Sequence, residues 1–428
     1  MLGVVELESR DRAEHHRHDA VVACETSCRA RVAVDEHCRL PPSGRLHRPA
    51  EGTLGGGTDK IWPVTELLPA ELDDLRDWTE LAYRLRLTDG LPVFPPLREV
   101  VDDLIAGSGR RGDDLIALIP PRDGHATVEA IAANAAMAGA LPEHMPVIVA
   151  ALEAMAEPEH NLRGLLLTTH GCWPLVIVSG DEVSRLDMAT SEMVFSGAGN
   201  RANVAIGRAI KLVTWNLGDT FPGEPVKEVF GHPGRLTYCI AESPDSPWEP
   251  LHRARGVDAD SGVTVFACES PHSVAMWACD DEPRTRLAQA ADAMAIRGSN
   301  NTHTMGEVLV VFTPSEARHL ADRGYGRAAV QRELFELARR RIGDIRPRGP
   351  LRPDTAPEHW YSWWPDWVDQ SDEDTLVPVV EKPEDIHVVV AGADSIPWIA
   401  VCPGWGHLGG FAVTRGLPGR GSDREVGA

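Results

Sequence analysis

The chain of 428 residues is poor in lysine and in aromatic residues, and it has no long apolar run. Only Lys60, Lys211, Lys227 and Lys382 are lysines among 42 basic residues, so few residues could serve as a catalytic lysine. No apolar run approaches the roughly 18 residues of a membrane-spanning helix. The N-terminus also lacks the basic-then-apolar layout of a secretory signal. We therefore expect a cytoplasmic protein that has no membrane partner.

Negative charge dominates the chain. Its net charge of −22 argues against nucleic acid or an anionic membrane as partner, because both would repel it. The composition, 43% hydrophobic, is that of a globular protein with one large or two medium domains. Eight cysteines in a cytoplasmic chain are expected to be thiols or ligands and not disulfides. A small-molecule substrate is the partner that remains, and assembly into a homo-oligomer is left open.

Segments typical of helices and of strands alternate along the chain. Helices are expected at 66–87, 97–106, 126–138, 145–156, 202–212, 283–296 and 327–341, and strands at 165–169, 175–178, 236–241, 263–267, 308–312, 387–390 and 398–401. A capping box, with Thr313 as the cap and Glu316 as its partner, predicts one more helix after the strand at 308–312. This alternation predicts an α/β fold with a mixed sheet, flanking helices and a pocket formed by loops at the strand ends.

Composition divides the chain into five parts. Residues 1–57 have no sustained apolar period and are expected to be a disordered tail or the product of a start codon placed too early. Residues 58–342 are expected to form the α/β core, which the strands within 386–415 complete. The Pro- and Trp-rich acidic segment 343–385 is either a lid over a pocket or an excursion anchored to the core by its aromatic residues. Residues 416–428 are expected to be a disordered tail.

Five polar motifs begin where apolar runs stop. They are Thr168–Cys172, Cys268–His272, Gly298–His303, Ala391–Ser395 and Cys402–His407. Because a sheet holds the loops at its strand ends rigidly, chemistry in α/β proteins is usually found there. The motifs therefore predict an enzyme or a ligand-binding protein.

The first two motifs carry the strongest catalytic candidates. His170 and Cys172 could bind one metal, or they could act as general base and thiolate nucleophile. Glu269 and His272 could supply a second ligand pair or an acid and a base. Cys402 follows a strand in a Gly-rich loop and would be reactive only with a lowered pKa. The simpler alternative for each His is a hydrogen-bonded structural residue.

A transition metal is the cofactor that these loops suggest. One ion could draw one ligand from each loop, with candidates at His170, Cys172, His272 and His303. Asn300 and Asn301 either point carboxamides at a substrate or form a turn with left-handed backbone.

The Gly-rich loop before the expected helix at 202–212 is a candidate anion site. Gly197 and Gly199 would expose backbone amides at the helix start, and Asn200 could hydrogen-bond a ligand. Arg201 would neutralise an anionic substrate. A dinucleotide site would also need a strand directly before the loop, and only Met193, Val194 and Phe195 precede it. The alternative is a Gly-rich turn that packs closely on a neighbour.

Four motifs in order resemble a family of bacterial proteins. They are Thr88–Val93, Thr168–His170, Arg201–Ala209 and Ser246–His252, and the similarity covers about residues 60–415. The resemblance implies no particular activity, although it suggests a gene that lies near those of thiol or selenol redox proteins. In that family Pro commonly follows Thr-Thr-His, where this chain has Gly171 and Cys172. This difference is compatible with a new thiol function in the loop.

The leading hypothesis is a small-molecule enzyme that uses a His/Cys site, with metal or thiol chemistry, on an anionic substrate. An oxidoreductase or lyase reaction is favoured, because no serine-nucleophile elbow or metalloprotease motif is present. The alternative is a non-catalytic protein that binds a small anion or a metal. A third hypothesis is an assembly subunit whose loops form interfaces.

Overall fold

The computed structural model describes residues 75–223, 225–277, 279–345, 364, 367–369, 371–406 and 409–419, which lie in one compact unit, 55–428. Its helices are α3 Leu75–Arg84, α4 Arg98–Ser108, α5 Val128–Met137, α6 Met145–Met155, α7 Leu162–Leu167, α8 Asp181–Arg185, α9 Arg201–Gly218, α10 Leu251–Ala254, α11 Pro283–Met294, α12 Asn300–Thr304, α13 Pro314–Ala321, α14 Arg327–Leu337 and α15 Ile342–Ile345. No helix of the described part is long and apolar enough to cross a membrane.

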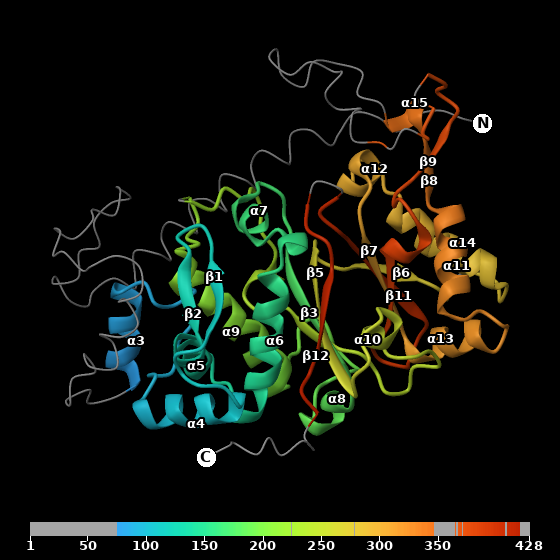
Figure 1. Ribbon diagram of the computed structural model, residues 1–428. Helices are drawn as coiled ribbons and strands as arrows, with labels where there is room; N and C mark the ends of the chain where they lie inside the picture. The colour runs from blue at the N-terminus through green and yellow to red at the C-terminus, as the bar shows by residue number, and fades with distance from the viewer. Residues whose placement is uncertain are drawn as a thin grey trace, which may run out of the picture. The chain divides into compact units, whose positions relative to one another are not determined.

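The strands confirm the predicted α/β class with mixed sheets (Figure 1). They are β1 Leu115–Ile119, β2 Gly124–Thr127, β3 Trp173–Gly180, β4 Cys239–Ala241, β5 Ser261–Cys268, β6 His272–Ala275, β7 Val308–Phe312, β8 Arg339–Arg341, β9 Leu376–Pro378, β10 Ile386–Val390, β11 Trp398–Pro403 and β12 Val413–Gly416.

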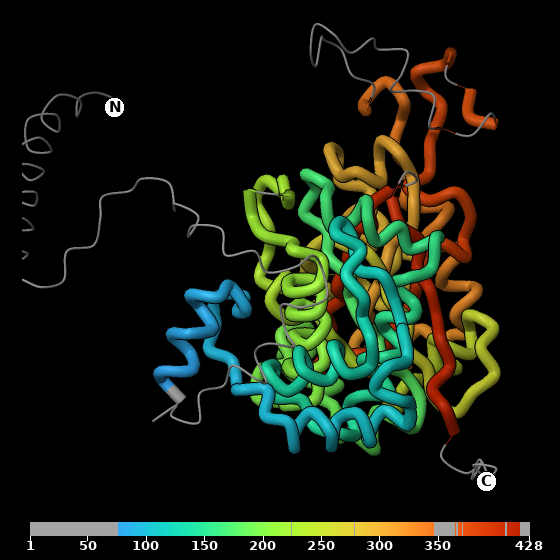
Figure 2. Tube along the Cα trace, turned by 60° about the vertical axis from the view of Figure 1, so that its left-hand side comes forward, coloured from blue at the N-terminus to red at the C-terminus, as the bar shows by residue number. Residues whose placement is uncertain are grey.

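Two four-stranded sheets form the framework. The first has the order β12-β5-β3-β4, in which β3 and β4 are parallel and the other neighbours antiparallel. The second has the order β10-β7-β11-β6, in which only β10 and β7 are parallel. Figure 2 shows β12, which comes last in the chain, running beside strands from its middle part. The sheets meet where β5 ends, because Cys268 bridges to Gly404 and the Glu269 amide donates to the Pro403 carbonyl at 2.9 Å.

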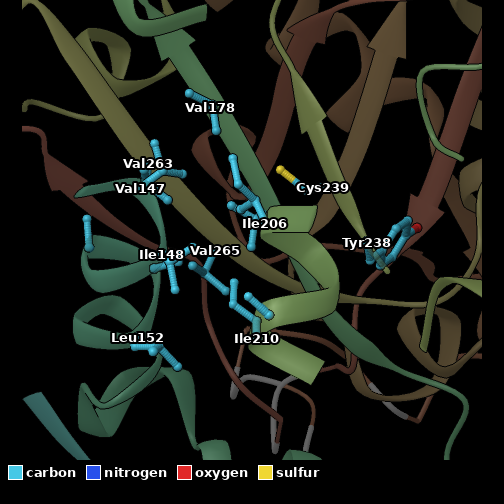
Figure 3. Close-up of a cluster of buried hydrophobic side chains, with 14 of the residues drawn as sticks. Val147, Ile148, Leu152, Val178, Ile206, Ile210, Tyr238, Cys239, Val263 and Val265 are labelled. Carbon is cyan, nitrogen blue, oxygen red and sulfur yellow. The ribbon is translucent and has the colours of Figure 1, made fainter. Parts of the chain in front are cut away.

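The main core lies between the first sheet and helices α5, α6 and α9. Figure 3 shows Ile148 and Leu152 of α6 and Ile206 of α9 gathered against the valines of β3 and β5. Every residue of β5 and all but the last of β3 are buried. This burial explains why both strands are nearly continuous apolar runs. The second sheet has its own core, in which α11 and α14 contact its strands.

One predicted strand is wrong, and one predicted helix is too long. The strand expected at 165–169 is part of helix α7, which Asn161 caps by accepting a hydrogen bond from the Gly164 amide at 3.2 Å. Leucine favours helix and the cap satisfies a free amide, so the leucine run continues the helix to Leu167. The helix expected at 327–341 ends at Leu337, and 339–341 pair with 376–378 as strands.

The helix predicted after Thr313 is present as α13, but the capping box is not. The Thr313 side chain accepts no capping bond, and Asp394 caps the helix by accepting from the Ser315 amide at 2.6 Å. Glu316 turns to Arg286, with which it forms a buried ion pair. Asp394 therefore stabilises a helix end from a distant loop.

The predicted tail 1–57 lies outside the described residues, as do residues 420–428 of the predicted tail 416–428 and Trp360 and Trp363. Within that second tail, Gly416 ends β12 and Leu417 is buried. Within the Trp-rich segment, Trp364 is buried in a cluster with Ile342, Ile345 and Val377. Trp367 is exposed. Trp364 therefore anchors its part of the segment, and the lid stays a prediction.

Candidate functional site

Three predicted side chains form one hydrogen-bonded chain at the junction of the two sheets. The sulfur of Cys172 lies 3.3 Å from Nδ1 of His170, and Nε2 of His170 lies 2.7 Å from Oε1 of Glu269. A carboxylate only accepts, so the ring proton belongs on Nε2 and Nδ1 accepts the thiol proton. Thiol, imidazole and carboxylate stand in the order of nucleophile, base and orienting group.

Backbone contacts hold this unit in place. The amide of His170 donates to Thr168 Oγ1 at 3.1 Å, directly after the end of α7. The Glu269 amide donates to Pro403, and its carbonyl accepts from the Tyr238 hydroxyl at 2.9 Å. Both backbone groups of Glu269 are thus fixed, which positions the carboxylate that in turn orients His170.

The three side chains differ in exposure. The side chains of His170 and Glu269 are 26% and 34% exposed, whereas Cys172 is fully buried. Burial, reinforced by the charge of Glu269, raises the pKa of the Cys172 thiol well above its ordinary value, and Arg235 opposes that shift. At rest the unit is therefore a neutral thiol beside an imidazole. Proton transfer to Nδ1 must accompany any attack by the sulfur.

Cys402 and Cys268 form a separate group. The sulfur of Cys268 lies 3.8 Å from the Tyr238 hydroxyl, and Cys402 acts electrostatically on both groups. These two cysteines belong to the main core, whereas Cys172 packs against Ala267. Because neighbouring strand residues face opposite sides, Cys268 and Ala267 lie on different faces of the sheet. Cys402 is therefore not part of the thiol–imidazole–carboxylate unit.

A pocket of about 540 Å³ lies near this unit, although none of the three side chains of the unit lines it. Its charged lining comprises Asp89, Lys211, Glu228 and Arg235, together with His232. Segment 226–236 supplies most of the pocket lining and forms the pocket rim segment. It contacts the thiol loop, 168–172, because the Val229 amide donates to the Thr169 carbonyl at 3.1 Å.

Arg235 links the pocket to Cys172. Its guanidinium lies 4.5 Å from the ring centre of Trp173, the residue after Cys172, and its charge acts on the thiol. Burial lowers the pKa of Arg235 to about 10, so it remains charged at neutral pH. Burial also lowers the pKa of His232, against the charge of Glu269. The pocket therefore places the charged guanidinium of Arg235, which is paired with Glu228, near the thiol.

The Gly197 loop lies apart from this site. Asn200 caps α9 by accepting from the Asn203 amide at 3.1 Å and donates to the Asp187 carbonyl at 2.6 Å. Arg201 donates to the Gly139 carbonyl at 2.9 Å. The helix rises 1.5 Å per residue, which separates Arg201 from Lys211 by about 15 Å. The loop, with Gly197 and Gly199 at positive φ, forms the start of the helix and is not brought to the pocket.

The remaining predicted residues are distributed around the second sheet. Asn300 donates to the Trp405 carbonyl, and Trp405 packs against Cys172, so this loop does approach the thiol. Asn301 is buried and donates to the Glu307 carbonyl at 3.1 Å. His272 is exposed at the start of β6, and burial lowers the pKa of His303 in α12.

Of the four predicted metal ligands, His170 and Cys172 lie 3.3 Å apart. Within the described residues, no three His, Cys, Asp or Glu side chains are arranged to hold a metal ion. Both ring nitrogens of His170 are already engaged by Cys172 and Glu269. The transition metal therefore stays a prediction from sequence.

A second cavity, of about 610 Å³, lies elsewhere and is lined by charges of both signs. Its buried Glu307 lies 3.1 Å from Nε2 of His387, which helps to lower the Glu307 pKa against the effect of burial. None of the predicted site residues lines this cavity.

Sequence analysis missed the residues that line the pocket beside Cys172. Lys211 and Arg235 belong to no polar motif, because Lys211 lies inside the apolar helix α9. One signal was available: a lone lysine among buried residues, in a chain with so few lysines. Comparison with protein-family models, with curated proteins and with solved structures gave no match.

Proposed function

We propose that this chain is a thiol-dependent enzyme, an oxidoreductase that exchanges thiols and disulfides on an anionic small molecule. The observation that carries the proposal is the chain of hydrogen bonds from Cys172 through His170 to Glu269. A thiol beside a base that a third group orients is the usual arrangement of an activated nucleophile.

The proton balance of this reaction closes within the unit. His170 takes the thiol proton as Cys172 sulfur attacks one sulfur of a small disulfide. A protein–substrate disulfide forms, the substrate S–S bond breaks, and the leaving thiolate takes the proton back from His170. A lyase reaction would need a second group to remove a proton from carbon. The three residues therefore favour exchange over elimination, the other class that the sequence allowed.

Charge in the adjoining pocket supports an anionic substrate. Arg235 is held beside Trp173 and acts electrostatically on Cys172. A positive group near the sulfur favours the thiolate in the transition state and attracts an anion.

The test compares two disulfides of similar size and opposite charge on the full chain. Dithiodipropionate carries two carboxylates and cystamine two ammonium groups, and peptide mapping by mass spectrometry follows the mixed disulfide at Cys172. We expect the anionic disulfide to react at least about tenfold faster. His170→Gln should slow the reaction about a hundredfold or more, and the matched control His272→Gln should leave it unchanged.

Two results would contradict the proposal. Reaction at another cysteine with Cys172 unmodified would remove the nucleophile, and equal rates for both disulfides would remove the anion preference. If every described thiol proves inert, the non-catalytic binding protein becomes the better account.

A further inference from the structure

Lys211 is an unusual residue in the pocket. It lies on α9, its side chain is 7% exposed, and it lines the pocket beside the thiol loop. Its amine lies 5.0 Å from the ring centre of Trp173 and 4.8 Å from that of Trp215. Lys211 and Arg235 thus both lie against the Trp173 ring.

The carboxylates around Lys211 are already paired with other groups. Asp89 accepts two bonds from Arg208, at 2.9 and 3.1 Å, and Glu228 forms an ion pair with Arg235. In the part of the chain that the structure describes, no hydrogen bond or ion pair reaches the Lys211 amine. A buried cation without an anion is costly, so its proton is held weakly.

The surroundings of the amine lower the pKa of Lys211. Burial, followed by repulsion from Arg235, lowers the pKa of Lys211 to about 7, although Asp89 acts in the opposite direction. Roughly half of the molecules therefore carry a neutral amine at pH 7. An anion placed next to the amine would restore the proton.

We propose that Lys211 is the anion-binding residue of this pocket, and that its ligand is an apolar or aromatic carboxylate. The carboxylate would meet the unpaired amine and Arg235, and the body of the ligand would lie against Trp215, Val226 and Leu236, which line the same pocket. The volume suits a small acid. This inference names a substrate class for the proposed thiol site, and it rests on that proposal only for the claim that the bound anion reacts.

Binding of the carboxylate should be coupled to uptake of a proton by Lys211. Calorimetric titration of the full chain with benzoate, in buffers of different ionisation enthalpy, measures the protons taken up. We expect one benzoate per chain, with uptake of about half a proton at pH 7, about none at pH 5.5 and close to one at pH 8.5. Benzamide, which has the same ring and no charge, should bind at least about tenfold more weakly.

Matched variants separate the contributions of charge and proton. Lys211→Met should weaken benzoate binding about ten- to a hundredfold and abolish proton uptake. Lys211→Arg should keep the binding and lose the uptake, because arginine is already charged. Lys227→Met, at an exposed lysine on the pocket rim segment, should behave as wild type.

Binding without proton uptake, or uptake that survives Lys211→Met in a folded protein, would overturn the inference. Absence of benzoate binding would overturn it as well. Cys172→Ser distinguishes this inference from the proposed function: benzoate binding should persist in that variant, whereas disulfide exchange should stop.

Discussion

Replacing Lys211 by Met should stabilise the protein at neutral pH. In the folded chain the pKa of Lys211 falls from 10.5 to about 7. A depressed pKa means that the stability present above pH 10.5 is lost as the pH falls toward 7, since the unfolded chain gains the proton first. At 1.36 kcal/mol per pKa unit, the loss is about 5 kcal/mol at pH 7.

Some of that loss is offset within the pocket. The indole rings of Trp173 and Trp215 face the amine at 5.0 and 4.8 Å, and each such contact is worth about 0.5–2 kcal/mol to the charged form. Asp89 favours the charge and Arg235 opposes it, and both are included in the lowered pKa. Methionine also fills the same apolar space. We therefore expect Lys211→Met to raise the free energy of unfolding by about 1–4 kcal/mol at pH 7.

Urea unfolding of wild type and variant at pH 7, 8 and 9 would test this. The advantage of Lys211→Met should shrink by about 1.4 kcal/mol per pH unit as the wild-type penalty disappears. Lys227→Met, at an exposed position, is the control and should show no such trend. A difference that does not change with pH, or a variant less stable than wild type throughout, would refute the electrostatic argument.

Three further predictions concern other groups. The charge of Arg235 acts to lower the pKa of Cys172. Arg235→Gln should therefore slow alkylation of Cys172 by iodoacetamide between pH 7 and 10, as measured by peptide mapping. Faster alkylation would show that the charge does not act on the sulfur. Asp394→Ala should cost about 0.5–2 kcal/mol in urea unfolding, because α13 loses its cap. Arg286→Met should cost about 3–5 kcal/mol, because it leaves the buried Glu316 unpaired, and adding Glu316→Leu should recover much of that loss.

Much of the fold is local in origin and could be predicted. β3, β5 and β7 are buried on both faces, so each is a continuous apolar run that the sequence displays directly. Helices α5 and α6 are similarly set by their alanine-rich and apolar composition. The leucine run at 165–167 is helical although a strand is predicted there, because a short apolar run is compatible with either helix or strand. The cap at Asn161 stabilises the helix.

The thiol site was partly predictable for the same reason. Cys172 and His170 are two residues apart, so any loop that contains them can bring them together. Glu269 was expected in a neighbouring loop because it follows a strand, and the pairing of β3 with β5 explains its approach.

The pocket residues were not predictable from their local sequence. Lys211 meets Arg235 and Trp173 only because α9 packs beside the first sheet, and no pattern in the sequence states that contact. Asp394 likewise caps a helix 79 positions away along the chain. Such pairings depend on tertiary structure and leave no mark in a local motif.

The central claim, that Cys172, His170 and Glu269 form one hydrogen-bonded unit, has a direct test in the tautomer of His170. Nitrogen-15 NMR of the labelled full chain, with His170→Gln used to identify its signals, distinguishes a protonated from an unprotonated ring nitrogen. The account predicts a proton on Nε2 and a lone pair on Nδ1, and it predicts that Glu269→Gln weakens this preference. A ring protonated on Nδ1, or a tautomer mixture that Glu269→Gln leaves unchanged, would contradict the proposed site.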